Sequence, residues 1–355
     1  MPSFKTGILG ATGAVGQKFI KLLQNHPWFS IAGLGASSRS AGKPYREAAH
    51  WIENIELPEA VAGLEVVNCD PSHFEDVDFV FSGLDSSVAG EIEGAFARAG
   101  VPVISNAKNY RMQEDVPLLV PEVNPDHTGL IQHQTFTADG SGWIVTNPNC
   151  VVIPLVMALR PLHDAYGVKC LIVTSMQAVS GAGYPGVPSL DILGNVIPYI
   201  GGEEPKIQSE PLKLLGNLEG NEIRFADIPI QATATRVPVQ NGHLLSVSVG
   251  LDKKPASKAD VVDFFKNWKS PVSGLELPTA PHYPLRVYDE ERFPQPKLQA
   301  DSEDGMQTAL GRIRDSNVLD LNFVAMAHNT IRGAAGGAIL NAELLVAKEG
   351  LKNRF

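Results

Sequence analysis

The order of elements between Lys5 and Lys43 constrains the fold of this chain more than any other sequence feature. The apolar stretch TGILG leads into the turn GATGAVG, an amphipathic segment follows, and FSIAGLGAS is a second apolar stretch. The three glycines of the turn allow, in order, a tight turn, close approach of the backbone to a pyrophosphate, and packing of the helix on the strand. This order predicts a dinucleotide-binding α/β domain. A glycine-rich turn without a ligand is the alternative.

The residues after the second predicted strand bear on which dinucleotide would bind. An NAD site usually offers an acidic residue to the ribose hydroxyls at this point. This chain instead has Ser37, Ser38 and Arg39, with Lys43 close behind. Hydroxyls and a guanidinium suit a 2′-phosphate, so the sequence favours NADP over NAD. A solvated basic loop is the alternative.

Two further predicted strands, Val77–Phe81 and Val101–Ser105, end in small polar residues. In an open α/β sheet, ligands bind beyond the carboxyl ends of the strands. Arg111 is therefore a candidate anion ligand, although an exposed loop arginine is the alternative. The polar residues expected at this rim are Ser82, Gly83, Ser86, Asn106 and Arg111.

The stretch WIVTNPNC, residues 143–150, ends in one of only three cysteines. Asn149 is a candidate helix N-cap, which places Cys150 in the first helical turn, facing outward. A helix N-terminus and a nearby histidine would lower the pKa of that thiol and favour the thiolate. Cys69 and Cys170 are typical of buried, inert cysteines. An odd, sparse cysteine count indicates a reducing compartment and no disulfide framework.

His243 is the candidate base for a nucleophilic cysteine. It follows an Asn-Gly turn and begins the alternating stretch HLLSVSV, and Arg236 lies seven positions earlier. An ordinary strand histidine is an equally good interpretation of the residues alone.

Composition excludes several classes of protein. A length of 355 residues favours two domains or one large one. The net charge of −10 argues against nucleic acid as the main partner, because phosphate backbones need clustered basic residues. No leader precedes the first strand, and no window approaches the ~18–20 apolar residues of a membrane span. We therefore expect a cytoplasmic protein without a membrane partner.

Taken together, the motifs resemble the aspartate-β-semialdehyde dehydrogenase family, in a form similar to its fungal and archaeal members. The resemblance covers essentially the whole chain and is specific only in combination. The segments that carry it are GATGAVG, ASSRSAGK, VPLLVPEVN, TNPNC, QAVSGAG, EEPK, RVPVQNGH and NTIRGAAGG.

The resemblance implies catalytic and substrate-binding roles. Cys150 resembles the nucleophile, His243 the acid/base catalyst, and Gln177 the residue that orients the acyl group. Arg236 resembles the clamp for the substrate α-carboxylate, and Glu203 the partner of the substrate amine. The resemblance assigns phosphate contacts to Lys206, Arg111 and Asn149. It also places Asn149 beside the oxyanion that forms when the nucleophile attacks the acyl carbon.

The resemblance also implies a set of cofactor contacts and no metal site. Two departures from the family pattern are present: His328 stands where an acidic residue is common, and Glu204 is adjacent to Glu203, so the register of EEPK has an alternative. The implied NADP-binding residues are Gly10, Thr12, Gly13, Ala14, Val15, Ser37, Ser38, Arg39, Ser82, Ser180, Gly181, Asn329, Thr330 and Gly333.

The expected fold class is α/β, a Rossmann-type dinucleotide-binding domain plus an α+β catalytic and dimerisation domain. We expect the first domain over 1–148, completed by a C-terminal helix over about 326–355, and the second over 149–325. By resemblance the chain is a homodimer or homotetramer. It would reduce L-4-aspartyl phosphate to L-aspartate 4-semialdehyde with NADPH through a thioester, in the aspartate pathway to lysine, threonine, methionine and isoleucine.

Two alternatives to this function stay open. N-acetyl-γ-glutamyl-phosphate reductase shares the chemistry but usually has a Gly-Cys pair where this chain has Asn149-Cys150. A non-catalytic NADP-binding sensor is the other alternative.

Overall fold

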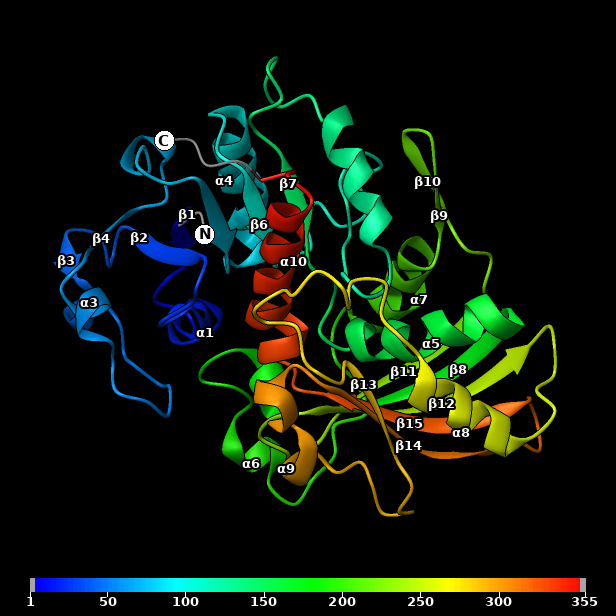
Figure 1. Ribbon diagram of the computed structural model, residues 1–355. Coiled ribbons are helices and arrows are strands. Elements are labelled where there is room, and N and C mark those ends of the chain that lie inside the picture. Colours follow the sequence, from blue (N-terminus) through cyan, green and yellow to red (C-terminus); the bar gives the residue numbers. More distant parts are fainter. Residues whose placement is uncertain (1–3, 352–355) are drawn as a thin grey trace.

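Two β-sheets form the framework of the molecule in the computed structural model, which describes residues 4–351. The first has seven strands in the order β3-β4-β2-β1-β5-β6-β7, and the second has six in the order β11-β8-β12-β15-β14-β13. A hairpin of β9 (Asn217–Glu219) and β10 (Glu222–Arg224) stands apart from both. Figure 1 shows the first sheet beside the chain termini and the second at the opposite end of the molecule.

The first sheet is parallel except at its edge strand β3, which pairs antiparallel with β4. The chain places β2 on one side of β1 and β5 on the other, which opens a crevice at the carboxyl ends of these strands. The strands are β1 (Phe4–Leu9), β2 (Phe29–Ala36), β3 (Lys43–Pro44), β4 (Glu65–Asn68), β5 (Phe79–Ser82), β6 (Val103–Ser105) and β7 (Ile144–Thr146).

Helices and a continuous apolar core hold this sheet. All four residues of β5 are buried, as expected for a parallel strand covered on both faces. The apolar stripe of α1, with Phe19, Ile20 and Leu23, packs into the same core. The helices of this region are α1 (Ala14–Leu23), α2 (Tyr45–Ala48), α3 (Glu59–Ala62) and α4 (Ser86–Arg98), with 3₁₀ segments at Pro71–His73 and Pro125–His133.

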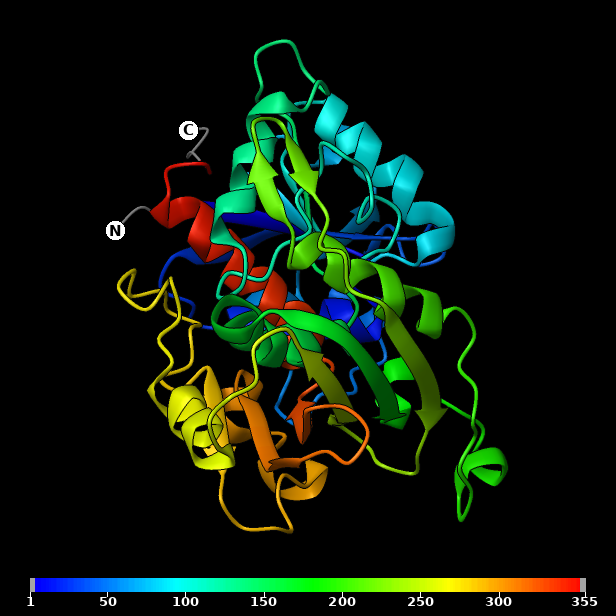
Figure 2. The ribbon, with the colours of Figure 1, turned by 90° about the vertical axis from the view of Figure 1, so that its right-hand side faces the viewer.

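The second sheet is mixed and carries helices on one face. Apolar residues of α5, α7 and α8 share a core with β8, β12 and β15. Its strands are β8 (Val168–Gln177), β11 (Ile230–Arg236), β12 (His243–Leu251), β13 (Leu285–Tyr288), β14 (Thr308–Asp315) and β15 (Leu321–Ala327). Its helices are α5 (Val152–Tyr166), α6 (Ser189–Ile192), α7 (Glu203–Leu214), α8 (Lys258–Asn267) and α9 (Pro296–Gln299), with 3₁₀ segments at Val179–Ala182 and Ser302–Gly305. The segment that contains α6 projects from the body in Figure 2.

The chain returns to the first sheet at its end. A π-helix at Ile331–Ala335 leads into α10 (Gly336–Ala347), and Ile339 and Leu344 share a core with Ile104 and Val145. Figure 1 shows α10 running beside β6 and β7. The predicted domain boundaries at 148/149 and 325/326 stay predictions. Residues 1–3 and 352–355, the two ends of the predicted first domain, lie outside the described residues.

Residues 4–351 contain neither a helix that could span a membrane nor a group of side chains that could bind a metal ion. No helix in that range is long and apolar enough to cross a bilayer. No group of three potential His, Cys, Asp or Glu ligands gathers in the same range.

Candidate active site

The glycine turn at residues 10–16 is fixed by close backbone contacts. Gly10 has a φ of +76°, and its carbonyl accepts a hydrogen bond from Gly13 N at 3.0 Å. A Cβ on Gly16 would lie 2.3 Å from the Gly10 oxygen, so a side chain cannot be accommodated there without movement. Gly13 occupies the N-cap position of α1 and supplies no side-chain cap. The first N–H groups of the helix therefore have no side-chain acceptor, which suits a pyrophosphate.

The other predicted cofactor residues lie in two places. Ser37, Ser38 and Arg39 are exposed directly after β2. Val15 lies next to Gly83, the residue that follows β5. A Cβ added to Gly83 would lie 3.1 Å from the Val15 Cγ1. Beside Gly83, Ser82 is buried at the end of β5.

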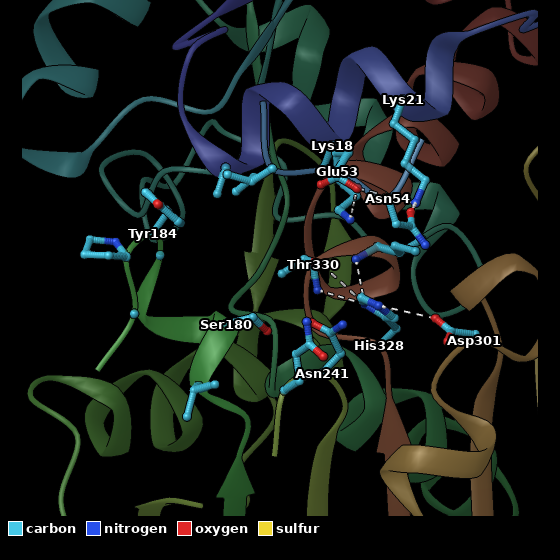
Figure 3. Close-up of a pocket in the computed structure, with 18 residues that line it drawn as sticks. Lys18, Lys21, Glu53, Asn54, Ser180, Tyr184, Asn241, Asp301, His328 and Thr330 are labelled. Carbon is cyan, nitrogen blue, oxygen red and sulfur yellow. Dashed lines mark hydrogen bonds and ion pairs between the residues drawn. The ribbon is translucent and has the colours of Figure 1, made fainter. Parts of the chain in front are cut away.

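A cavity of about 640 Å³ brings together residues of α1 and residues 52–54 with four segments of the second half of the chain. Ala14, Ser180 and Thr330 all line it, and Figure 3 shows Ser180 and Thr330 below α1. Asn329 donates to the Ser180 hydroxyl at 2.8 Å. Thr12 contributes its carbonyl to the side-chain amide of Gln17 at 3.1 Å.

His328, the departure from the family pattern, also lines this cavity. Its Nδ1 accepts from the backbone N–H groups of Thr330 and Ile331, both at 3.2 Å. Burial, reinforced by the charge of Lys18, lowers the pKa of His328 to about 4. A neutral imidazole thus occupies a position where an acidic residue would add a negative charge.

The turn that carries Cys150 differs from the prediction. Helix α5 begins at Val152 with Val151 at its N-cap position, so the prediction that Asn149 caps a helix containing Cys150 is wrong by two residues. The Asn149 side-chain oxygen accepts from Val151 N at 3.0 Å, and its carbonyl accepts from Val152 N at 2.9 Å, so the turn that holds Cys150 leads directly into the helix. Cys150 is half-buried in this turn, and a Cβ on Gly333 would lie 2.7 Å from its Cβ.

The charge environment of Cys150 also differs from the prediction. Burial, with Glu203 acting in the same direction, raises the pKa of Cys150 to about 12. Arg111, Lys206 and Arg236 act in the opposite direction. The prediction of a lowered thiol pKa is therefore wrong for this structure, because desolvation and a nearby carboxylate outweigh three cations.

Glu203 is the centre of a polar network beside the cysteine. Its carboxylate accepts from the Asn149 amide at 3.0 and 3.1 Å, from the Gln177 amide at 3.3 Å and from the Lys206 amine at 2.6 Å. Burial favours the neutral acid, but these donors and the charge of Lys206 hold the pKa of Glu203 below its usual value. Glu204 turns away and accepts from Ala234 N at 3.1 Å.

Arg236 and His243 are held by the same backbone residue. Arg236 donates to the Ala178 oxygen at 2.7 Å, and His243 Nδ1 accepts from Ala178 N at 3.0 Å. An Nδ1 that accepts places the proton of the neutral imidazole on Nε2. That Nε2 is buried without a hydrogen-bond partner among residues 4–351, and a Cβ on Gly181 would lie 3.0 Å from it.

Burial fixes the charge of this histidine. Together with the charges of Arg236 and His328, burial lowers the pKa of His243 to about 3. His243 is therefore neutral near pH 7 and presents an N–H donor rather than a base.

Two charged residues of α7 reach the site without having been predicted. Glu210 contacts Arg111 at 2.8 Å, and Lys213 donates to the Arg111 carbonyl at 2.9 Å. Arg111 also donates to the Asn106 oxygen at 2.7 Å. Positions 203, 206, 210 and 213 share one helical face, a spacing that could have revealed them.

Comparison with known proteins gives consistent matches over the whole chain. A family model described as the NAD binding domain of semialdehyde dehydrogenase matches residues 5–131, and one described as the dimerisation domain matches residues 159–332. An aspartate-semialdehyde dehydrogenase of Archaeoglobus fulgidus is 49% identical over 346 residues, 98% of this chain and 99% of the relative.

Solved structures show the same likeness. The crystal structure of aspartate semialdehyde dehydrogenase with NADP from Candida albicans matches with a TM-score of 0.91 and 42% identity, over 98% of this chain and 99% of that one. The aspartate semialdehyde dehydrogenase II of Vibrio cholerae complexed with ASA matches with a TM-score of 0.76 and 27% identity, over 98% and 99% of the two chains.

Proposed function

The chain belongs to the aspartate-semialdehyde dehydrogenase family, and from this premise we propose that it reversibly converts L-4-aspartyl phosphate and NADPH into L-aspartate 4-semialdehyde, phosphate and NADP. This reaction belongs to the aspartate pathway to lysine, threonine, methionine and isoleucine. The observation that carries the proposal is the placement of one cysteine among three cations and a carboxylate.

The glycine turn supports NADP as the cofactor. Its uncapped helix N-terminus fits a pyrophosphate, and the exposed Arg39 and its neighbouring serines suit a 2′-phosphate. Ser180, Asn329 and Thr330 would hold the nicotinamide half near Gly181 and Gly333. When bound, the reduced nicotinamide of NADPH supplies a hydride to the acyl carbon that is attached to Cys150.

The charges around Cys150 match the three charged groups of the substrate. Arg236 would clamp the α-carboxylate, and Glu203 would bind the α-ammonium. Arg111 and Lys206 would bind the phosphate, beside the Asn149 amide. A substrate ammonium at Glu203 would offset the negative charge that helps raise the pKa of Cys150.

The bond changes follow from this arrangement. Cys150 attacks the β-acyl carbon as the thiolate, its proton passing to the phosphate or to solvent. The bond between that carbon and the phosphate oxygen breaks, and phosphate leaves toward Arg111 and Lys206. The acyl group is then a thioester, with Gln177 placed to orient it. After hydride transfer, the carbon–sulfur bond breaks and the aldehyde leaves.

His243 acts as a hydrogen-bond donor in this scheme. Its Nε2–H faces no other acceptor among the described residues, so it is available to the oxygen that gains negative charge. The Asn149 backbone N–H is unavailable for that purpose, because it donates to Glu210 at 2.6 Å.

We also propose that the chain forms a homodimer or homotetramer and works in the cytoplasm. Exposed apolar side chains gather on the projecting segment around α6, where Leu190 is 92% and Leu193 70% exposed. Such a patch supports burial against a second copy. Three free cysteines support a reducing compartment.

The decisive experiment follows NADPH formation with purified protein, NADP, phosphate and L-aspartate 4-semialdehyde. We expect turnover that falls at least ~10⁴-fold in Cys150→Ser, because the hydroxyl is a far weaker nucleophile. Unchanged melting temperature and unchanged NADP binding in that variant would show that only the nucleophile was lost.

Two outcomes would contradict the proposal. Turnover with N-acetylglutamate γ-semialdehyde alone would assign the chain to the related reductase. NADP binding without turnover of either aldehyde would support a sensor.

A further inference from the structure

Glu210 joins the two parts of the site that must meet when the acyl group moves between phosphate and the cysteine. It lies on α7 and is 2% exposed. One carboxylate oxygen accepts from the Arg111 guanidinium at 2.8 Å, and the other accepts from the backbone N–H of Asn149 at 2.6 Å. Arg111 lies in the loop after β6, and Asn149 begins the turn that carries Cys150. A single carboxylate therefore links the candidate phosphate ligand to the nucleophile turn.

Lys213, one turn further along α7, holds the other end of Arg111. It is fully buried, and its amine donates to the carbonyls of Arg111, Gln113 and Val116 at 2.9, 2.6 and 2.7 Å. Arg111 is thus fixed to α7 through its main chain by Lys213 and through its side chain by Glu210. All three N–H donors of Lys213 and both oxygens of Glu210 have partners, as burial of charges requires.

Arg111 keeps donor capacity after these contacts. One of its terminal nitrogens binds Glu210 and the other the Asn106 carbonyl, while its buried Nε has no partner within residues 4–351. Its charge lowers the pKa of the Cys150 thiol, against the larger effect of burial.

We propose that Glu210 is a positioning residue that fixes Arg111 relative to the Asn149–Cys150 turn, so that the guanidinium is placed for the phosphate. This inference rests on the proposed function, in which Arg111 binds that phosphate. Glu210 touches neither substrate nor cofactor in this scheme and acts through its two partners.

Glu210→Gln tests the inference with little change in shape. Glutamine has one acceptor oxygen, and its amide nitrogen cannot accept from either Arg111 or Asn149 N, so one of the two links is lost. In the direction that consumes phosphate, we expect the KM for phosphate to rise about tenfold and the KM for the aldehyde to change less than about twofold. Glu210→Asp keeps both acceptor oxygens and should recover part of the loss.

A second readout does not need turnover. Inorganic phosphate should slow alkylation of Cys150 by iodoacetamide, measured by mass spectrometry, and Glu210→Gln should need about tenfold more phosphate for the same protection. The matched control is Glu59→Gln, which breaks an exposed Arg46–Glu59 pair of the same chemistry and should change neither value.

The outcomes separate the two levels of the proposal. Equal protection of the wild type and Glu210→Gln by phosphate would overturn the role of Glu210 and leave the proposed function standing. An absence of protection in the wild type would overturn phosphate binding at Arg111, and the role of Glu210 with it. A rise in both KM values together with a lower melting temperature would indicate a merely structural residue and would also overturn it.

Discussion

The glycine turn at 10–16 and the turn at Cys150 follow strands of the same sheet, yet they are built in opposite ways. The glycine turn is made of consecutive residues whose backbones contact one another, and its fit depends on missing side chains. The surroundings of Cys150 are made of side chains such as Arg111, Glu203 and His243, which arrive from separate elements. Adding an atom should therefore break the first turn, and removing one should break the second.

After loss of the nucleophile itself, the largest effect should come from removing the N–H of His243. In His243→Asn, the side-chain oxygen can still accept from Ala178 N, but the donor at Nε2 is gone. We expect kcat to fall about 10²–10⁴-fold, with the melting temperature unchanged, as measured by steady-state assay and calorimetry.

The pH dependence checks the same assignment. A pKa of about 3 keeps His243 neutral throughout the range from pH 5 to 9, so its ionisation should add no inflection to the wild-type profile of kcat/KM. An inflection near the ordinary histidine pKa of ~6.5 that disappears in His243→Asn would contradict this structure.

A smaller effect should follow from one added methyl group in the glycine turn. The new Cβ in Gly16→Ala would meet the Gly10 oxygen at 2.3 Å and the Ala11 Cα at 2.6 Å, so the turn must move. Overpacking of this kind costs about 1–3 kcal/mol, and we expect a lower melting temperature and weaker NADPH binding by calorimetry. Gly63→Ala is the control, because nothing lies within 4 Å of its Cβ. Equal melting temperatures and equal NADPH affinities of the two variants would contradict a cofactor turn that depends on close backbone contacts.

The smallest effect should come from replacing Arg39. Here, unlike at the glycine turn, the cofactor would be bound by a side chain. Arg39→Gln should lower the preference for NADP over NAD, as a ratio of kcat/KM values, by about tenfold, since one exposed charge-assisted contact of ~1.4 kcal/mol is lost. Arg46→Gln, a nearby exposed arginine paired with Glu59, should leave the ratio unchanged. A ratio equal to the wild type in Arg39→Gln would move 2′-phosphate recognition elsewhere.

This contrast also explains how far the sequence could lead. The strand, turn and helix around Gly10 and Gly16 are local, and the apolar pattern and the glycine spacing predict them directly. The alternating pattern after His243 likewise predicts β12.

The contacts around Cys150 could not be predicted in the same way. Glu210 and Arg111 are 99 positions apart, and charged residues on a helix ordinarily indicate a solvated face. The pKa of Cys150 depends on burial and on Glu203, neither of which a local sequence pattern reports. Even the start of α5 depends on a side-chain hydrogen bond of Asn149 within the preceding turn.

The return of α10 to the first sheet has a consequence during synthesis of the chain. Ile339 and Leu344 share a core with Val145, but a ribosome adds only about 5–20 residues per second. Ile339 therefore joins the chain roughly 10–40 s after Val145. Throughout that interval the nascent N-terminal half carries an apolar surface that its own last helix has not yet covered, and chaperones that bind such surfaces have time to engage it.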